Sequence, residues 1–344
     1  MSTMQAFRLL EWGKLGYDDV AVPEPTPGEV LVRVGGAGLC GSDLHFKHMP
    51  AGAWPAEPPW TLGHENAGWV ERSGPGTSRF AAGDAVLATG IHSCGNCRAC
   101  LRGDDNQCHL VFGGRGAGMD GGFASFVVVP ERELVPLGSL DPRVAAPLAD
   151  AGHASYAAVR SALPKLTPDA TALVIGAGGL GSYAVQFLKI LTASRVIVAE
   201  PSAARRSHAL ALGADGAIDS DLTTASAVRD LTCGWGADVI LDFVATQDTI
   251  KAGTASAAVG GSVVLVGMHG GSLDLVFGRT PPVACQLYWQ MGGSLKDLTE
   301  VVALGRRGLL QIDVEHFSFS DIELAFDRLE AGTTAGRAVV LPNG

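Results

Sequence analysis

The strongest constraint on the fold is a regular alternation of short apolar strands with amphipathic helices between residues 171 and 267. The expected strands are TALVI (171–175), RVIVAE (195–200), ADVILDFVA (237–245) and GSVVLVG (261–267), and the expected helices span 180–191, 202–212 and 247–258. Strand–helix alternation of this kind indicates βαβ units that build a parallel sheet. The sequence therefore predicts an α/β fold in this part of the chain.

A glycine-rich loop joins the first of these strands to its helix. In LVIGAGGLGSYAVQFLK, Gly176, Gly178 and Gly181 form the pattern G-x-G-x-x-G, with Gly179 and Leu180 between the last two. The first glycine makes a tight turn, the second lets the backbone approach a pyrophosphate, and the third lets the helix pack close to the sheet. The N–H groups at the helix start favour the phosphates. We expect these five residues to bind a dinucleotide, in preference to forming an ordinary βαβ turn.

Glu200 bears on which dinucleotide is bound. It ends the second strand, 19 residues after Gly181, where a carboxylate accepts hydrogen bonds from ribose hydroxyls and repels a 2′-phosphate. Arg205 and Arg206 follow, and an arginine there can hold a 2′-phosphate, but it is also compatible with NAD, stacking on the adenine or lying near the ribose. We expect Glu200 and Arg205 to contact NAD.

The rest of the chain has a different pattern. Residues 1 to about 140 are predicted to be rich in β-strands, such as EVLVRVGGA and FASFVVVPERELV, which are separated by turns rich in glycine and proline. An alanine-rich helical stretch follows at 139–163. From about Gln290 we expect helices near 294–308 and 321–332 and a last strand at 337–342.

Composition excludes several classes of protein. The chain has 344 residues, enough for two domains, with a formal net charge of −10, and no basic stripe stands out, so nucleic acid is not an expected partner. The longest apolar candidate, TALVIGAGGLGSYAVQFLKIL, is interrupted by glycines and a lysine, and the N-terminus lacks the features of a signal peptide. We expect a cytoplasmic protein with no membrane partner.

Four of the seven cysteines lie close together: Cys94, Cys97, Cys100 and Cys108. Four thiolates at this spacing can surround one zinc ion tetrahedrally and leave no position for substrate, so the predicted role is structural. An Fe–S cluster is the rival for four cysteines, but no electron-transfer partner is evident. A zinc-ribbon DNA-binding module is a further rival, and the acidic chain weighs against it.

A catalytic metal needs about three protein ligands and an open position. Cys40, in GLCGSDLHF, can be a nucleophile, a metal ligand or a small buried residue. His64, in TLGHENAG, is a second candidate ligand. Asp150, in APLADAGH, is an acid among apolar neighbours and needs a partner, because a buried unpaired carboxylate is costly.

With these residues in place, the chain resembles the zinc-dependent medium-chain alcohol dehydrogenases over essentially its whole length, and among them bacterial secondary-alcohol dehydrogenases. The residues that carry the resemblance occur in the family's order: GLCGSDLH, LGHENAG, the four cysteines, PLADAG, GAGGLG and Glu200. The resemblance implies a β-rich GroES-like catalytic domain from residues 1–150 and 290–344, with a zinc lobe at about 92–110. It also implies a Rossmann domain with a doubly wound parallel sheet at 151–289.

The same resemblance implies two zinc ions per chain and NAD in the cleft between the domains. Catalytic zinc would be held by Cys40, His64 and Asp150, and structural zinc by Cys94, Cys97, Cys100 and Cys108. Family members are homodimers or homotetramers. The implied reaction is reversible hydride transfer between NAD and a small alcohol or ketone, for which we expect secondary alcohols.

Further roles follow from the resemblance, residue by residue. Ser42 matches the hydroxyl that contacts the zinc-bound alcohol, and His45 matches the imidazole that ends a proton relay through the nicotinamide ribose. Asp43 matches a carboxylate that orients the histidine ligand. Glu65 matches a carboxylate behind the zinc, and Arg337 matches a pyrophosphate contact.

Two positions depart from the liver-type enzymes of this family. Gly41 stands where those enzymes carry a basic residue, and Asp150 replaces a cysteine ligand. The competing predictions are a polyol- or threonine-type zinc dehydrogenase, because CGSDLH also resembles that branch, and a non-catalytic dinucleotide-binding protein.

Some residues near the motifs are secondary candidates. His48 and His153 are candidates for contact with substrate, and Trp54 and Trp289 for the wall of a substrate pocket. Cys233 and Cys285 are expected to be ordinary small buried residues.

Overall fold

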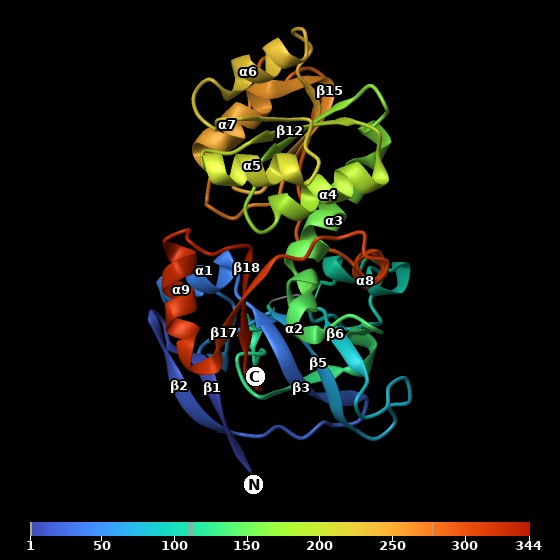
Figure 1. Cartoon of the computed structure of the whole chain (residues 1–344), viewed down its shortest axis with the longest axis vertical. Helices are drawn as coiled ribbons and strands as arrows, with labels where there is room; N and C mark the ends of the chain where they lie inside the picture. The colour runs from blue at the N-terminus through green and yellow to red at the C-terminus, as the bar shows by residue number, and fades with distance from the viewer. Residues whose placement is uncertain (1, 110–112, 277) are drawn as a thin grey trace. The chain divides into compact units, whose positions relative to one another are not determined.

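A computed structural model describes residues 2–109, 113–276 and 278–344 (Figure 1). Contacts within the chain divide it into two compact units. Unit 1 is Met1–His153 with Ser294–Gly344, and unit 2 is Ala154–Gly293. The expected domain boundaries were at 150/151 and 289/290.

Unit 1 contains a largely antiparallel seven-stranded sheet in the order β10-β6-β5-β3-β18-β17, with β9 paired to β3. The strands are β3 (Glu29–Gly38), β5 (Glu65–Ser73), β6 (Ala85–Ala88), β9 (Phe126–Pro130), β10 (Leu134–Pro136), β17 (Val314–Ser318) and β18 (Arg337–Leu341). Two small sheets complete the unit, β2-β1-β4 and β7-β8. Their strands are β1 (Thr3–Glu11), β2 (Lys14–Ala21), β4 (Trp60–Thr61), β7 (Gly114–Arg115) and β8 (Gly118–Met119).

The C-terminal segment belongs to unit 1 because of its strand pairing. Val339 and Val340 of β18 pair antiparallel with Gly38 and Ala37 of β3, and β17 pairs in parallel with β18. Helix α9 (Ile322–Glu330) lies beside these two strands (Figure 1). The final strand therefore sits next to the segment that leads into Cys40.

Alternating apolar side chains build the core of unit 1. Val30, Val32 and Val34 of β3 are almost fully buried, as expected for the inward face of a strand. They share one cluster with Phe7 and Phe326. The ring centroids of these two phenylalanines are 5.6 Å apart. This core fixes the position at which β3 ends and the position at which β5 begins, and both positions lie at the site described below.

A helical stretch connects the two units. It consists of α2 (Pro142–Ala145), the 3-10 turn η4 (Ala146–Ala149) and α3 (Ala151–Ala162), with Asp150 at the junction of the last two. Helix α8 (Leu295–Arg306) follows where the chain returns to unit 1. The sequence predicted helical structure in both places.

Unit 2 contains a six-stranded parallel sheet in the order β13-β12-β11-β14-β15-β16, which confirms the predicted parallel sheet. Its strands are β11 (Thr171–Ile175), β12 (Arg195–Ala199), β13 (Gly216–Ile218), β14 (Ala237–Asp242), β15 (Ala257–Leu265) and β16 (Gln286–Trp289). The strand order reverses direction between β11 and β14. This topological switch point is where ligands bind in open α/β sheets.

The helices of unit 2 are α4 (Gly181–Leu191), α5 (Ala203–Ala211), α6 (Thr224–Leu231) and α7 (Gln247–Ser256). Three of them match predicted helices with shifted ends, whereas α6 and the short strand β13 before it were not predicted. β14 stops at Asp242, before the predicted end at 245, because the Asp242 carboxylate accepts hydrogen bonds from the N–H groups of Val244 and Ala245 and turns the chain. The edge strand β16 was not predicted.

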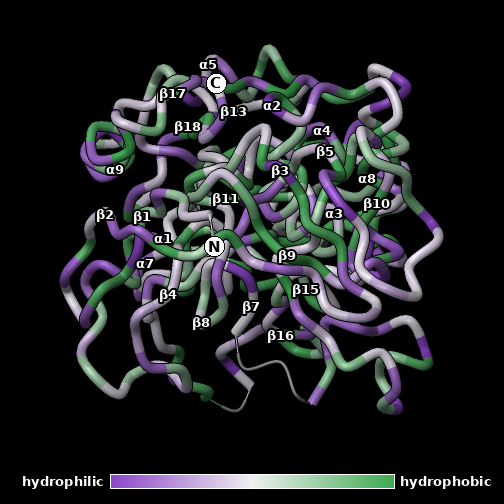
Figure 2. The backbone as a smooth tube through the Cα atoms, turned by 90° about the horizontal axis from the view of Figure 1, so that it is seen from below, coloured by the Kyte–Doolittle hydropathy of each residue, from purple (hydrophilic) through white to green (hydrophobic). Residues whose placement is uncertain are grey.

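Hydrophobic and hydrophilic stretches alternate along the backbone (Figure 2). Among the described residues, no helix is both long and apolar enough to span a membrane.

Candidate active site and metal clusters

The end of β3 and the start of α1 (Gly41–His48) place Cys40 in unit 1. Cys40 is the N-cap of α1, with extended backbone angles, and its side chain is 6% exposed. A helical turn therefore begins directly after Cys40. His64 directly precedes β5, and Asp150 lies at the break between η4 and α3.

These three side chains converge, although Cys40 and Asp150 are 110 positions apart in the chain. Cys40 Sγ lies 3.4 Å from Asp150 Oδ2, and His64 Nε2 lies 3.6 Å from the same oxygen. Together with Glu65 they form a group whose ligand atoms all lie within 4.8 Å of one another, here called the Cys40 cluster. Ligand atoms around one tetrahedral zinc are separated by about 3.3–3.8 Å, given bond lengths of about 2.0–2.3 Å. The donor set fits a zinc ion.

Asp43 holds the histidine of the cluster. Its side chain is fully buried, with Oδ2 accepting a hydrogen bond from Cys40 N at 2.9 Å and Oδ1 lying 3.4 Å from His64 Nδ1. A carboxylate on Nδ1 turns Nε2 toward Asp150, which is the arrangement found around metal-bound imidazoles.

Glu65, the fourth member of the Cys40 cluster, pairs with Arg337, the first residue of β18. Both side chains are buried, and the space that a Cβ on Gly38 would fill holds Glu65 Oε2. Only glycine at position 38 therefore allows the carboxylate to lie there. Glu65 Oε2 has no hydrogen-bond partner, as expected of an oxygen that faces a cation site.

Burial and charge shift the pKa values of the cluster. Burial disfavours a protonated His64, but the neighbouring Asp43 and Asp150 raise its pKa well above the usual value. Burial opposes ionisation of Asp150, yet its hydrogen bond with His64 keeps the pKa of Asp150 below the usual range. Burial raises the pKa of Glu65 to about 7 against the opposing charge of Arg337. A cation bound here would compete with these protons.

Ser42 and His45 both lie on α1. Ser42 Oγ is 3.9 Å from Cys40 Sγ, so the hydroxyl borders the cluster. His45 lies three residues further, on the same side of the helix. At Gly41, a Cβ would meet no atom within 4 Å, so this exposed position has room for the larger side chain that the liver-type enzymes carry.

The second cluster lies in the cysteine lobe, residues 92–109 in the described part of the chain. Its sulfur atoms are 3.5 Å apart for Cys97 and Cys100, 3.6 Å for Cys94 and Cys108, and 3.9 Å for Cys94 and Cys100. Four sulfurs around zinc at about 2.3 Å are separated by about 3.8 Å. The four-thiol group therefore also fits zinc.

Backbone groups prepare the lobe for a cation. A hydrogen bond from the backbone of Cys100 lowers the pKa of Cys97 to about 5, so this thiol loses its proton readily. Cys97 N also donates to Cys94 Sγ at 3.3 Å. Hydrogen bonds to sulfur favour the thiolate, which is the form that binds a metal.

The glycine loop of unit 2 has the geometry that its sequence predicts. Gly176 has φ of 84°, a left-handed conformation that glycine adopts without strain. A Cβ on Gly181 would lie 1.8 Å from Gly176 O, so only glycine allows α4 to start there. A Cβ on Gly178 would meet nothing within 4 Å, which leaves the loop open to a ligand. Gly179 and Leu180 are half-buried at the start of α4.

Glu200 anchors this loop. Its side chain is 3% exposed, and its two oxygens accept from Ala177 N at 2.8 Å and Ser202 N at 2.9 Å. Arg205 lies in the first turn of α5, and Arg206 donates to the carbonyl oxygens of Glu200 and Pro201. Asp242, which closes the turn after the neighbouring strand β14, was not among the predicted site residues. Its position as an acid at the end of an apolar strand could have identified it.

The four secondary candidates lie in different surroundings. His153 is buried and bonds Ser294 O at 2.8 Å, and burial lowers its pKa. His48 is exposed and pairs with Glu330. Trp54 packs edge-on against Phe46, whereas Trp289 is 63% exposed on β16.

The prediction that Cys233 is buried is wrong. Cys233 is exposed, because it lies with a positive φ of 52° in the turn that ends α6, and Cys285 is half-buried.

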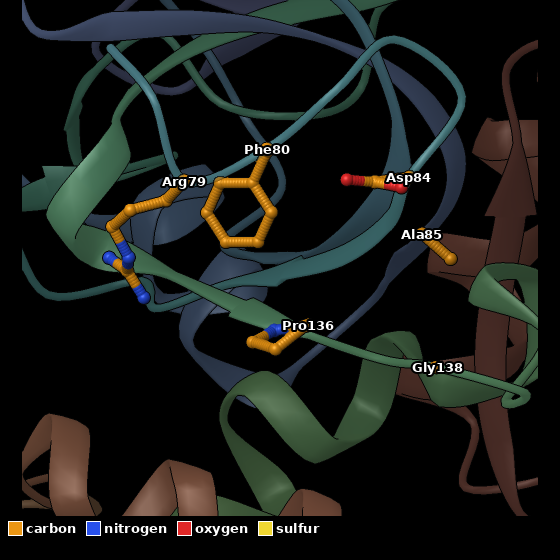
Figure 3. Close-up of a pocket in the computed structure, with 6 residues that line it drawn as sticks. All are labelled: Arg79, Phe80, Asp84, Ala85, Pro136 and Gly138. Atoms are coloured by element: carbon orange, nitrogen blue, oxygen red, sulfur yellow. The ribbon is translucent and has the colours of Figure 1, made fainter.

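A surface hollow of about 430 Å³ also lies in unit 1 (Figure 3). Arg79, Phe80 and Pro136 border it, with Asp84 on the far side. Arg79 already donates to the carbonyl oxygens of Glu131 and Leu134. No residue of either metal cluster lines this hollow.

A β-rich unit with two zinc-compatible clusters and a unit with a doubly wound sheet and a dinucleotide loop define a zinc-binding dehydrogenase. The alcohol dehydrogenase GroES-like domain matches residues 26–139, and the zinc-binding dehydrogenase domain matches residues 179–302. The chain belongs to the zinc-dependent medium-chain alcohol dehydrogenase family, and its GroES-like and Rossmann architecture is confirmed.

Relatives match along their whole length. The chain is 37% identical to D-arabinose 1-dehydrogenase (NADP+) of Saccharolobus solfataricus, over 95% of this chain and 94% of that protein. It is 31% identical to an NAD-dependent alcohol dehydrogenase of Sulfurisphaera tokodaii, over 98% and 100% of the two chains. It is 33% identical to L-threonine 3-dehydrogenase of Pyrococcus horikoshii, over 94% of each.

Among solved structures, an alcohol dehydrogenase from Aeropyrum pernix superposes with a TM-score of 0.93 at 34% identity, covering 98% of this chain and 100% of that one. The family implies zinc and a nicotinamide cofactor.

Proposed function

We propose that this dehydrogenase is an NAD-dependent zinc alcohol dehydrogenase that interconverts secondary alcohols and ketones. The observation that carries the proposal is the convergence of Cys40, His64 and Asp150, with Asp43 buried behind the histidine. Three protein ligands leave a fourth position of a zinc ion for substrate, whereas the four thiols of the cysteine lobe leave none.

When bound, zinc supplies a Lewis acid for the substrate oxygen, and the nicotinamide supplies the hydride acceptor. The residues of the chain have separate tasks. Cys40, His64 and Asp150 hold the metal, and Asp43 keeps His64 in the required tautomer. Ser42 would accept the proton of the substrate hydroxyl while its own hydroxyl proton passes on toward His45, one turn along α1, and His45 would release a proton to solvent.

Glu200 supports NAD over NADP. A nearly fully buried carboxylate that is held by two N–H groups cannot move away from a 2′-phosphate, and like charges repel at short range. Arg205 would lie against the adenine or the ribose. The backbone of Gly176, Gly178, Gly179, Leu180 and Gly181 would hold the pyrophosphate. Arg337 would contribute a positive charge near the pyrophosphate, as the resemblance implies, while it stays paired with Glu65.

The family also supports a sugar- or threonine-type substrate, since D-arabinose and L-threonine appear in the names of relatives. A non-catalytic dinucleotide-binding protein has no need of the ligand set or of Ser42 beside it. Cytoplasmic location stays a prediction.

The test is a set of initial rates with NAD+ and NADP+ over primary, secondary, aromatic and polyhydroxylated alcohols, D-arabinose and L-threonine, together with metal analysis. We expect two zinc ions per chain and the highest kcat/KM for a secondary alcohol with NAD+. Activity restricted to L-threonine or to sugars and polyols would replace the proposed substrate. A protein that shows no activity and binds fewer than two metal ions per chain would contradict the proposal as a whole.

We also propose that the protein is a homo-oligomer that uses the edge of the sheet in unit 2. Among the described strands, only β15 pairs with β16, so one side of β16 has free backbone groups. Leu287 and Trp289 on this strand and Val283 just before it are 36%, 63% and 65% exposed. An apolar open edge is a pairing surface. A second copy related by a two-fold axis would continue the sheet antiparallel across it.

A further inference from the structure

The cysteine lobe contacts the rest of unit 1 through a residue that is not a cysteine. Asp105 begins the 3-10 turn η2 (Asp105–Gln107), between Cys100 and Cys108. Both of its carboxylate oxygens accept from Leu295 N, at 3.0 and 3.1 Å, across 190 positions of sequence. Leu295 is the first residue of α8, so the carboxylate satisfies an N–H that the helix cannot bond itself and faces the positive end of the helix.

The residue before Leu295 continues the connection. Ser294 is the N-cap of α8, fixed by reciprocal hydrogen bonds with Asp297. Its carbonyl oxygen accepts from His153 Nε2 at 2.8 Å, and the side chains of both residues are 2% exposed. His153 lies in the first turn of α3, three residues after Asp150 of the Cys40 cluster.

Helix α8 also packs against the segment that carries Asp150. A Cβ on Gly152 would lie 3.3 Å from Val301 Cγ1 and 3.1 Å from Leu148 Cδ2. A Cβ on Gly305, about one turn beyond Val301 on α8, would lie 3.4 Å from Leu148 Cδ1. Helix α8 and segment 146–152 are therefore closely packed at Gly152 and Gly305, so a displacement of one would displace the other.

We propose that Asp105, the N-terminus of α8 and His153 form a positioning strut through which the cysteine lobe holds Asp150 in the Cys40 cluster. The lobe then has a role beyond local stability: it sets the metal affinity of the other cluster. Asp105 and His153 act through Asp150, so both are positioning residues. The inference rests on the proposed metal binding at the two clusters.

Cobalt(II) makes the two clusters separately visible, because a site with four thiolates and a site with one thiolate absorb differently. Protein loaded with cobalt at both clusters is mixed with excess EDTA, and the loss of each spectrum is followed. Asp105→Ala is expected to speed cobalt loss from the Cys40 cluster about tenfold, the range seen when residues that orient metal ligands are removed. The four-thiolate spectrum is expected to persist.

Matched variants distinguish loss of the strut from a general destabilisation of the protein. Asp104→Ala changes an exposed acid in the same lobe and should release cobalt like the wild type. Asp105→Asn keeps an oxygen that accepts from Leu295 N and should recover most of the wild-type rate. His153→Phe breaks the strut at its other end and should speed release from the Cys40 cluster by a similar factor. The double variant should be no faster than either single one, since both cut the same path.

A readout independent of the metal is hydrogen exchange of peptides covering 150–156 and 294–298, which we expect to be faster in Asp105→Ala than in Asp104→Ala. The strut is refuted if Asp105→Ala keeps the wild-type rate at the Cys40 cluster, or loses cobalt from the cysteine lobe alone. Failure of the proposed function looks different: wild-type protein would then bind fewer than two metal ions.

Discussion

At the scale of single residues, the site depends on side chains that hold other side chains. Asp43 is fully buried, accepts a hydrogen bond from the backbone N–H of Cys40 and lies 3.4 Å from Nδ1 of His64. Glu200 does the same for the glycine loop by accepting from Ala177 N and Ser202 N. In each case a buried carboxylate is tolerated because its partners are fixed. The positions of the residues that would react or bind are therefore set before any ligand arrives.

Ser42→Ala should lower kcat about 100-fold with little change in metal content, because the variant loses the proton acceptor and keeps the ligands. Steady-state rates and metal analysis of the same preparation check this result. Ser207→Ala, an exposed serine on α5, serves as the control and should keep wild-type kinetics. Wild-type turnover in Ser42→Ala would remove Ser42 from the mechanism.

Glu200→Gln should raise the ratio of kcat/KM for NADP+ to that for NAD+ about tenfold, because the charge that repels a 2′-phosphate is gone while the size is kept. The ratio is obtained from initial rates with both cofactors. If both values fall and the ratio stays the same, Glu200 acts only as an anchor for the glycine loop.

At the scale of elements, one turn carries backbone strain and one buried ion pair adds stability. Ala245, in the turn after β14, has φ of 59° and is 6% exposed. Beside the cysteine lobe, Glu133 is 2% exposed and pairs with the fully buried Arg115 at 2.8 Å. Glu133 also pairs with His92 and accepts from Ser93 N, so it fixes the segment from which the lobe begins.

Ala245→Gly should stabilise the protein by about 1 kcal/mol, because a left-handed conformation is costly for alanine and not for glycine. Ala252→Gly, in the interior of α7, should have the opposite sign and cost about 0.5–1 kcal/mol. Denaturant unfolding of both variants gives the comparison. A loss of stability in Ala245→Gly would show that the turn carries no strain.

Glu133→Gln should lower the free energy of unfolding by about 3 kcal/mol at pH 7, because Arg115 is left buried without its counter-charge. Burial opposes ionisation of Glu133, but His92 and Arg115 keep its pKa below the usual value. The stabilisation by ionised Glu133 is therefore fully present at pH values above the pKa of Glu133 in the unfolded state. It is lost as the pH falls through the lower pKa of Glu133 in the folded state. The difference in the free energy of unfolding between Glu133→Gln and the wild type should become smaller over that acidic range.

Unfolding curves measured from pH 7 downward test the sign of this effect. Glu71→Gln, at an exposed ion pair with Arg33, is the control and should unfold almost like the wild type. A difference that grows on acidification would contradict the assignment to Glu133.

At the scale of the whole molecule, unit 1 is built from both ends of the chain and unit 2 from its middle. The pairing of β18 with β3 explains this arrangement, since it brings the C-terminal segment and Arg337 beside Glu65. One unit carries the two metal clusters, and the other carries the dinucleotide loop and an apolar open sheet edge.

The pair of substitutions Leu287→Lys and Trp289→Lys should convert the proposed oligomer to monomers, because charges at a sheet edge oppose pairing with a second copy. Sedimentation velocity gives the mass of the variant. Trp235→Lys, at a tryptophan that is 80% exposed outside β16, is the control and should leave the mass unchanged. An unchanged mass in the double variant would place the interface elsewhere.

Much of unit 2 could be predicted from sequence because its signals are local. Strand length, helix amphipathicity and the glycine spacing all act within a few residues, and α4, α5 and β12 lie within a few residues of their predicted bounds. Predictions failed where a single contact decided the outcome. Asp242 ends β14 early, and Cys233 is exposed by the turn in which it lies.

The sequence by itself determined the kinds of ligand atoms and their order: one cysteine, one histidine and one aspartate far apart, four cysteines close together, and a glycine loop between a strand and a helix. Tertiary structure decided which distant residues meet. Cys40 reaches Asp150 over 110 positions because the end of β3 and the break between η4 and α3 meet in unit 1. Asp105 reaches Leu295 over 190 positions because the chain returns to unit 1 at α8. Such contacts depend on the packing of whole elements, and no pattern within a short stretch of sequence specifies them.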